Sequence, residues 1–116
     1  MIQDLKESDT IYVIGNGGNM AVASHAAADI TRLTNKKVWC LDSQALLTSI
    51  ANDFGYENLF SAELEMIGGP GDILVAISSS GNSPNIINAI KKSKEILKLK
   101  TFSTRHSHMC TKILNY

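Results

Sequence analysis

The sequence has few of the features that mark membrane, secreted or nucleic-acid-binding proteins. No apolar run approaches the roughly eighteen residues that a membrane-spanning helix needs. The polar N-terminus, Met1 to Lys6, lacks the apolar core of a signal peptide. Eleven basic residues balance eleven acidic ones, so no net charge attracts nucleic acid or an anionic membrane. We therefore expect a cytoplasmic protein with a small-molecule partner and no direct binding to nucleic acid or to a membrane.

Cysteine is also scarce, since only Cys40 and Cys110 are present. Their spacing fits neither a zinc knuckle nor the dense disulfide framework of a small secreted domain. We interpret both as reduced, structural thiols. The length of 116 residues suits one domain, and 44% hydrophobic with 19% charged residues is typical of a globular chain.

Short apolar runs alternate with segments of helical periodicity. The runs rich in β-branched residues predict strands at 10–14, 37–41, 73–77 and 100–103. Apolar spacing predicts helices at 20–33, from Asp42-Ser43 through Ile50, at 58–67 and at 84–99, with Asp42 and Ser43 as polar caps. This alternation predicts an α/β three-layer sandwich with a parallel, Rossmann-like sheet, and ligands bind such sheets at the carboxyl ends of the strands.

The loop 78–84, with the sequence Ser-Ser-Ser-Gly-Asn-Ser-Pro, joins a predicted buried strand to a predicted helix. A helix start offers unpaired N–H donors and a partial positive charge, which suit a phosphate group without Lys or Arg. An ordinary turn with an N-cap would explain Gly81 and Ser83 but not the three serines before them. We therefore predict phosphate binding here.

A second loop, Gly15-Asn16-Gly17-Gly18, also lies between a strand and a helix. It could begin a dinucleotide fingerprint, but Met20 occupies the third glycine position and Asp42 follows later than the usual acidic residue. Nicotinamide cofactor binding is therefore the weaker alternative. A tight turn that simply requires glycine is the structural alternative, and we favour a ligand-binding loop.

His25 and Asp29 are four residues apart on the predicted helix at 20–33, so they share one face. We place that face near the edge with the loops. The pair can ligate a metal or share a proton, yet a surface contact explains the spacing equally well, and a zinc site needs three or four ligands. Asn52 and Asp53 are expected in a turn after a helix, where both residue types are common.

Five separated motifs together resemble the phosphoheptose (sedoheptulose 7-phosphate) isomerase family, within the wider class of sugar isomerase (SIS) domains. They are Gly15-Asn16-Gly17-Gly18, the segment 25–29, the segment 51–56, Gly71-Asp72 and the segment 78–83. The resemblance spans about residues 10 to 101. It implies an SIS-type sheet and aldose–ketose isomerisation of sedoheptulose 7-phosphate to a heptose 7-phosphate, for bacterial surface heptose synthesis.

The resemblance also implies roles for individual residues. The serine loop would hold the phosphate, while the glycine loop and the Asn-Asp pair would contact the sugar. His25 and Asp29 would ligate zinc, with Asp29 as the catalytic base, and the protein would form a homotetramer with sites between subunits. The implied substrate-binding residues are Asn16, Gly17, Gly18, Asn52, Asp53, Ser78, Ser79, Ser80 and Ser83.

The chain departs from the family pattern at several places. Asp29 stands where the family has Glu, which shortens the side chain of the base by one methylene, and Asn19 stands where it usually has Ser. The family's remaining zinc ligands, a Gln and a His on a C-terminal helix, have no match in 105–116. His106 and His108 are weak substitutes, because they lie in a polar tail expected to be exposed and mobile.

We accordingly divide the chain into a lead at 1–9, an SIS-like domain at 10–104 and an unmatched tail at 105–116, with a fold incomplete at both ends. A truncated or frameshifted reading of the gene would explain the abrupt end of the match. Three functions stay open: an isomerase, a non-catalytic phosphosugar-binding or regulatory domain, and an inactive fragment with an exposed sheet edge.

Overall fold

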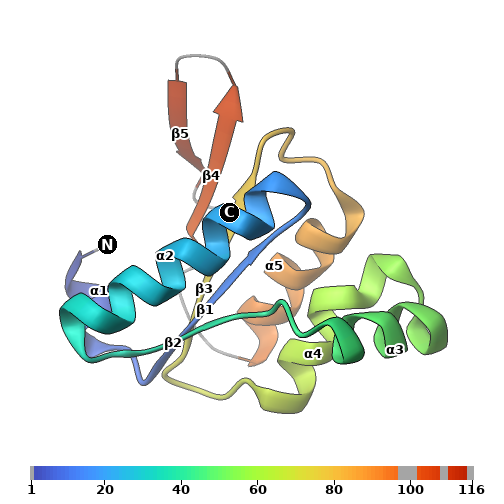
Figure 1. The fold of residues 1–116 in the computed structure, drawn as a ribbon, viewed down its shortest axis with the longest axis horizontal. Helices are drawn as coiled ribbons and strands as arrows, with labels where there is room; N and C mark the ends of the chain where they lie inside the picture. Colours follow the sequence, from blue (N-terminus) through green and yellow to red (C-terminus); the bar gives the residue numbers. More distant parts are fainter. Residues whose placement is uncertain (1, 97–101, 108–109, 115–116) are drawn as a thin grey trace.

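The computed structural model describes residues 2–96, 102–107 and 110–114 and contains a five-stranded sheet. Helices cover both faces of its first three strands, and the last two strands project from one edge (Figure 1). The elements are α1 (Ile2–Glu7), β1 (Thr10–Gly15), α2 (Gly18–Thr34), β2 (Lys37–Cys40), α3 (Gln44–Phe54), the 3₁₀ turn η1 (Tyr56–Asn58), α4 (Leu59–Ile67), β3 (Ile73–Ser78), α5 (Pro84–Ile96), β4 (Phe102–Ser107) and β5 (Cys110–Leu114). The strand order is β2-β1-β3-β4-β5. The predicted α/β sandwich is therefore confirmed.

The sheet is parallel across β2, β1, β3 and β4, as predicted, but β5 is antiparallel to β4. No strand was predicted for β5. The predicted fourth strand at 100–103 overlaps β4 at its last two residues, its first two lie outside the described residues, and β4 extends beyond the prediction to Ser107, which pairs with Cys110. The extension depends on pairing with β5, which local β-propensity does not report. Residue 104, the predicted end of the domain, lies inside β4.

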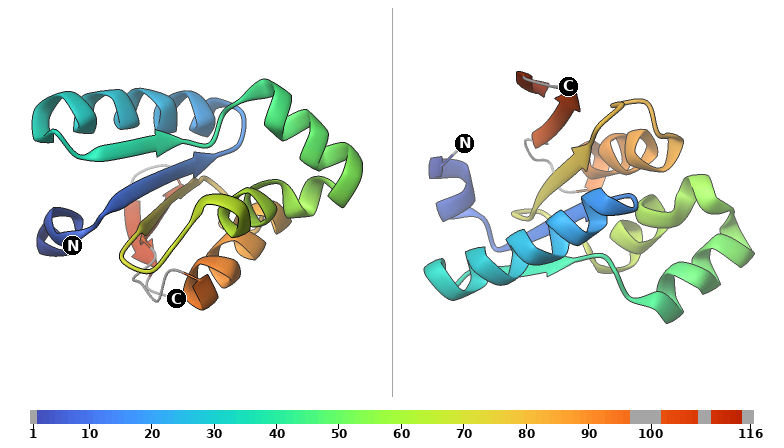
Figure 2. Two further views of the ribbon diagram at one scale, coloured as in Figure 1. Left: turned by 90° about the horizontal axis from the view of Figure 1, so that it is seen from below. Right: turned by 45° about the horizontal axis from the view of Figure 1, so that its top comes forward.

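Successive side chains of β1 enter two different cores, because they alternate across the sheet. Ile11 and Val13 pack in the core with α2, while Tyr12 and Ile14 pack in the core with α3, α4 and α5. Figure 2 shows these two layers of helices on opposite faces of β1. The larger core is centred on Phe60 and Leu64, buried side chains of α4. Full burial of such side chains stabilises a fold by about 1.5–3 kcal/mol each.

Small side chains let α2 approach the sheet closely. Ala23 and Ala27 are buried against β1 and β2, with Met20 and Ile30 partly buried beside the two cores. This spacing confirms the helical periodicity predicted from the sequence. The helix itself is longer than the predicted 20–33, since it begins at Gly18 and ends at Thr34.

Several local predictions need correction. Asn52 and Asp53 lie within α3 rather than in a turn after a helix, because the helix continues to Phe54 and ends before Gly55. Ser43 occupies the N-cap position of α3, yet its side chain makes no capping hydrogen bond. The predicted end of the helix at 84–99 lies outside the described residues, and the described part of α5 ends at Ile96.

The lead at 1–9 contains the short helix α1, which was not predicted. Its C-terminal end is held to the body of the protein by backbone contacts, with the Asp9 N–H donating to the Gly71 carbonyl at 2.9 Å. The Lys36 ammonium donates to the Ser8 carbonyl at 2.9 Å. No helix in the described part of the chain is long and apolar enough to cross a membrane.

Candidate functional site

The two predicted loops begin side by side at one edge of the sheet. β1 and β3 are parallel neighbours, and Gly15 at the end of β1 pairs with Ile77 near the end of β3. The loops therefore share the carboxyl edge, where parallel sheets bind ligands. A hydrogen bond of 3.1 Å from Asn19 Nδ2 to Ser79 Oγ joins them directly.

Glycine at position 15 allows the chain to turn sharply from β1 into α2. A Cβ atom there would lie 2.6 Å from the backbone carbon and oxygen of Asn19, well inside van der Waals contact. Gly17 adopts a φ of 56°, a left-handed conformation that glycine reaches without steric cost. Gly18 has open space around it. The turn therefore explains Gly15 and Gly17 structurally, but it does not require glycine at 18.

Three serine hydroxyls of the second loop use their oxygens as hydrogen-bond acceptors. Ser78 Oγ accepts from the Gly81 N–H at 3.0 Å, and Ser80 Oγ accepts from the Asn82 N–H at 3.1 Å. Ser79 Oγ accepts from Asn19. Because each hydroxyl also carries one donor hydrogen, this arrangement keeps three O–H donors for an acceptor such as phosphate. The N–H groups of Gly81 and Asn82 are already bonded, so the hydroxyls are the better candidates for binding an anion.

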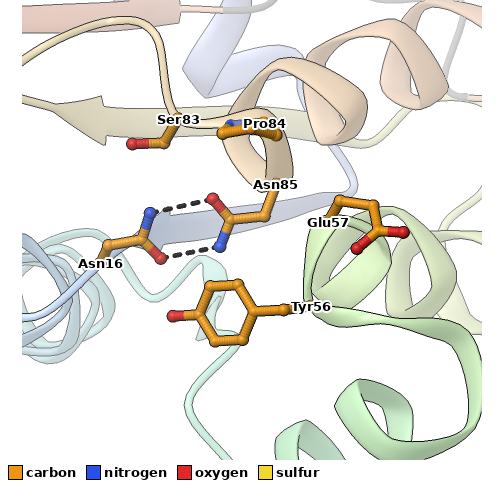
Figure 3. A pocket seen from close by; sticks show the side chains of 6 residues that line it. All are labelled: Asn16, Tyr56, Glu57, Ser83, Pro84 and Asn85. Carbon is orange, nitrogen blue, oxygen red and sulfur yellow. Dashed lines mark hydrogen bonds between the residues drawn. The ribbon is translucent and has the colours of Figure 1, made fainter.

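A pocket of about 330 Å³ opens between the first loop, η1 and the start of α5 (Figure 3). It is lined by Asn16, Tyr56, Glu57, Ser83, Pro84 and Asn85. The predicted site residues Asn16 and Ser83 thus come together, although they are far apart in sequence. The sequence analysis did not predict Tyr56, Glu57 or Asn85 as lining residues. Their places in the sequence could have indicated them, because Tyr56 ends the motif 51–56, Glu57 follows it and Asn85 follows the loop 78–84.

Asn16 and Asn85 form a reciprocal pair of side-chain hydrogen bonds across the pocket. Asn16 Nδ2 donates to Asn85 Oδ1 at 2.9 Å, and Asn85 Nδ2 donates to Asn16 Oδ1 at 2.8 Å (Figure 3). Asn85 is only 2% exposed. The pair joins the loop after β1 to the first turn of α5, so these two walls of the pocket are held together at this point.

The predicted pair Asn52 and Asp53 does not line this pocket. Both side chains are exposed on α3, where Asn52 Nδ2 donates to Asp53 Oδ1 at 2.9 Å. Their role as sugar contacts is therefore not supported by the pocket of a single chain and stays a prediction.

His25 and Asp29 contact each other on α2, with 3.1 Å between Nε2 and Oδ2. Their side chains are 80% and 49% exposed, and neither lines the pocket. At 1.5 Å per helical residue, Asp29 lies roughly 16 Å along the axis from the start of α2 at Gly18. The pair is confirmed as a contact, but the expectation that it faces the edge with the loops is not supported.

The described residues do not fit a zinc site. Nowhere among them do three or more His, Cys, Asp or Glu side chains gather where they could hold a metal ion. His25 and Asp29 supply two donors, and a catalytic zinc uses three protein ligands. His106 lies in β4 and His108 lies outside the described residues, so their suggested part as substitute ligands stays a prediction.

Two further titratable side chains, Cys40 and Glu63, are partly or fully buried and do not line the pocket. Burial, with a smaller effect from Asp42, raises the pKa of the Cys40 thiol to about 12, so it is not a nucleophile at neutral pH. Glu63 on α4 is 4% exposed, and its Oε2 has no hydrogen-bond partner among the described residues. Burial and then the nearby Asp42 raise the pKa of this carboxyl.

Comparison with known proteins identifies related chains. A family model described as "SIS domain" matches residues 1–97. Phosphoheptose isomerases from Neisseria meningitidis and Campylobacter jejuni are 44% and 41% identical over 101 and 98 residues, covering 82% and 79% of this chain. The matches cover 51% and 53% of those proteins, so this chain spans about half the length of the relatives it matches.

Two solved structures resemble the fold. The phosphoheptose isomerase GmhA from Neisseria gonorrhoeae has a TM-score of 0.74 and 40% identity, over 83% of this chain and 52% of that one. A phosphoheptose isomerase from Francisella tularensis has a TM-score of 0.81 over 93% of this chain and 59% of that one. The second is 24% identical and shows the fold alone.

Proposed function

This chain belongs to the SIS domain family, and from that premise we propose that it binds sedoheptulose 7-phosphate between the loops after β1 and β3. The relatives named phosphoheptose isomerase support the choice of ligand. The observation that carries the proposal is the serine loop, in which three hydroxyl oxygens accept hydrogen bonds and keep their O–H donors for an anion.

The charges around the pocket favour one orientation of the ligand. A carboxylate repels a phosphate dianion, so Glu57 disfavours the phosphate at its side of the pocket. The phosphate would therefore bind at Ser78, Ser79, Ser80 and Ser83. The hydroxylated carbons of the sugar would then extend past Asn16 toward Tyr56 and Glu57. The Tyr56 hydroxyl can donate or accept hydrogen bonds with the sugar hydroxyls, and the Glu57 carboxylate can accept them.

We further propose that the reaction is aldose–ketose isomerisation. A base removes a proton from the hydroxylated carbon beside the carbonyl, a proton passes from the hydroxyl oxygen to the carbonyl oxygen, and the enediolate is reprotonated on the former carbonyl carbon. Asp29 is the base that the family resemblance indicates. Because Asp29 does not line the pocket of a single chain, this role would require an assembly in which the Asp29 carboxylate approaches the sugar. The homo-oligomer and the cytoplasmic location stay predictions.

Binding and turnover can be tested separately. Thermal melts are recorded with sedoheptulose 7-phosphate, with sedoheptulose and with inorganic phosphate. The thermal midpoint should rise most with the phosphorylated sugar and less with phosphate, because the ligand that binds more tightly stabilises the folded protein more. A folded protein that ignores all three would remove the proposal. Turnover is then followed by NMR in heavy water, where isomerisation incorporates solvent deuterium beside the carbonyl.

A non-catalytic phosphosugar-binding domain is the second candidate. The observation that favours it is the contrast between a well-formed serine loop and a proposed base outside the pocket. Tight binding of sedoheptulose 7-phosphate without deuterium incorporation would support this candidate over the isomerase. Deuterium incorporation would exclude it as the only role.

A further inference from the structure

The buried asparagine at the start of α5 requires an explanation beyond the helix itself. Asn85 lies on the buried face of α5 together with Ile86, Ala89 and Ile90. Burying an amide costs free energy unless its hydrogen-bonding groups are satisfied. An apolar residue would pack on this face without that requirement, so the contacts of the Asn85 side chain indicate what the amide does.

The backbone fixes the orientation of the Asn85 amide. The Ile86 N–H can only donate, and Asn85 Oδ1 shares it with the Ser83 carbonyl, each oxygen at 3.0 Å, so the carbonyl end of the side chain faces it. The amino end then faces Asn16 Oδ1 at 2.8 Å. This in turn places Asn16 Nδ2 against Asn85 Oδ1 at 2.9 Å. A single N–H at the start of α5 therefore sets the orientation of both side chains.

The pair leaves Asn16 with a defined set of unused groups. A primary amide has two N–H donors and two carbonyl lone pairs, and Asn16 gives one of each to Asn85. Among the described residues its second donor and second lone pair meet no protein group. Asn16 is partly exposed and lines the pocket, so one donor and one acceptor, on opposite sides of the amide, remain for two separate groups of a ligand.

We propose that Asn85 is a positioning residue that holds the Asn16 amide in one orientation, so that Asn16 binds the hydroxyl groups of the sugar and not its phosphate. A hydroxyl both donates and accepts, which matches the donor and acceptor that Asn16 presents, whereas a phosphate dianion only accepts. This inference rests on the proposed function, because it assigns Asn16 to one part of that ligand.

The test compares two probes on the same variants by calorimetry: sedoheptulose 7-phosphate and inorganic phosphate. Asn85→Ala should weaken binding of the phosphorylated sugar roughly tenfold and change phosphate binding less than about twofold. Lys94→Ala is the control, since Lys94 is exposed in the last turn of the same helix and does not line the pocket. This control should leave the ratio of the two dissociation constants unchanged.

A double-mutant cycle distinguishes positioning from a separate contact. If Asn85 acts through Asn16, adding Asn85→Ala to Asn16→Ala should cause no further loss of sugar-phosphate affinity. Should Asn85→Ala fold poorly, Asn85→Asp replaces it, because a carboxylate still accepts from the Ile86 N–H and suits the first turn of a helix. It cannot donate to Asn16, so the ratio of the two constants should still change.

The outcomes separate this inference from the proposed function. Equal losses for both probes, or losses that add in the double variant, would show a structural role and overturn the inference alone. A wild-type protein that is folded but binds no sedoheptulose 7-phosphate would overturn the proposed function and the inference with it. A selective, non-additive loss supports both.

Discussion

The loops at the carboxyl edge of the sheet and the His25–Asp29 pair on α2 differ in the contacts that hold them in place within this chain. The loops are joined by hydrogen bonds from Asn16 to Asn85 and from Asn19 to Ser79. His25 and Asp29 contact each other on an exposed helix face, and neither lines the pocket. The difference suggests that a single chain preorganises ligand binding, whereas the residues implied in chemistry depend on further groups.

The largest expected effect comes from breaking the loop at its tightest point. Gly15→Ala places a Cβ where the Asn19 backbone lies 2.6 Å away, so the start of α2 must move. Overpacking of this kind costs about 1–3 kcal/mol of unfolding free energy. We expect a lower thermal midpoint and no detectable midpoint shift with sedoheptulose 7-phosphate.

Gly18→Ala is the control for this change, because a Cβ at 18 meets nothing within 4 Å and alanine favours the helix that begins there. Its thermal midpoint should equal or exceed that of the wild type. Normal ligand binding by Gly15→Ala would mean that the geometry of the turn does not form the site.

A change in the core should alter stability without altering the loops. The pKa of the Glu63 carboxyl is raised by burial and by Asp42, so the folded state holds a proton that the unfolded state releases near its ordinary pKa of 4.5. Stability therefore falls as the pH rises from that value through the raised folded pKa. Glu63→Gln removes this fall, and its advantage over the wild type should grow across that window and stay constant above it.

Urea unfolding from pH 4 to pH 8 measures the effect of Glu63→Gln, with sedoheptulose 7-phosphate affinity as the second measurement. A gain on the order of 1 kcal/mol at pH 8 is expected, since the neutral amide avoids the burial of a charged carboxylate. Parallel pH profiles of the variant and the wild type would exclude Glu63 as the titrating group. Altered affinity would link this part of the core to the loops.

A smaller effect is expected from the bridge between the two loops. Asn19→Ser installs the residue that the family resemblance indicates at this position and removes the 3.1 Å hydrogen bond to Ser79 Oγ. An exposed hydrogen bond contributes about 0.5–1.5 kcal/mol, so affinity for sedoheptulose 7-phosphate should fall roughly twofold to tenfold. Calorimetry measures it, and tighter binding by the variant would mean that Asn19 obstructs the ligand.

Local pattern was sufficient to predict β1, β2 and β3, the four helices α2 to α5 and the two loops of the candidate site. The period of apolar residues located α2 and β3, and glycine and serine clusters located the turns. The sequence could not indicate β5, because that strand depends on pairing with β4. Asn85 was missed for a similar reason, since its partner Asn16 is 69 positions away and nothing near residue 85 announces that contact.

The smallest expected effect concerns the response of the His25–Asp29 pair to zinc. The pair formed by His25 and Asp29 offers two exposed donors, so zinc should leave the thermal midpoint unchanged in a sample that responds to sedoheptulose 7-phosphate. A zinc-dependent rise that is lost in His25→Ala would contradict this and show that further ligands reach α2 from a second copy or from residues beyond 96. A rise that survives in His25→Ala but is lost in a His106→Ala, His108→Ala double variant would place the metal at the C-terminal strands instead.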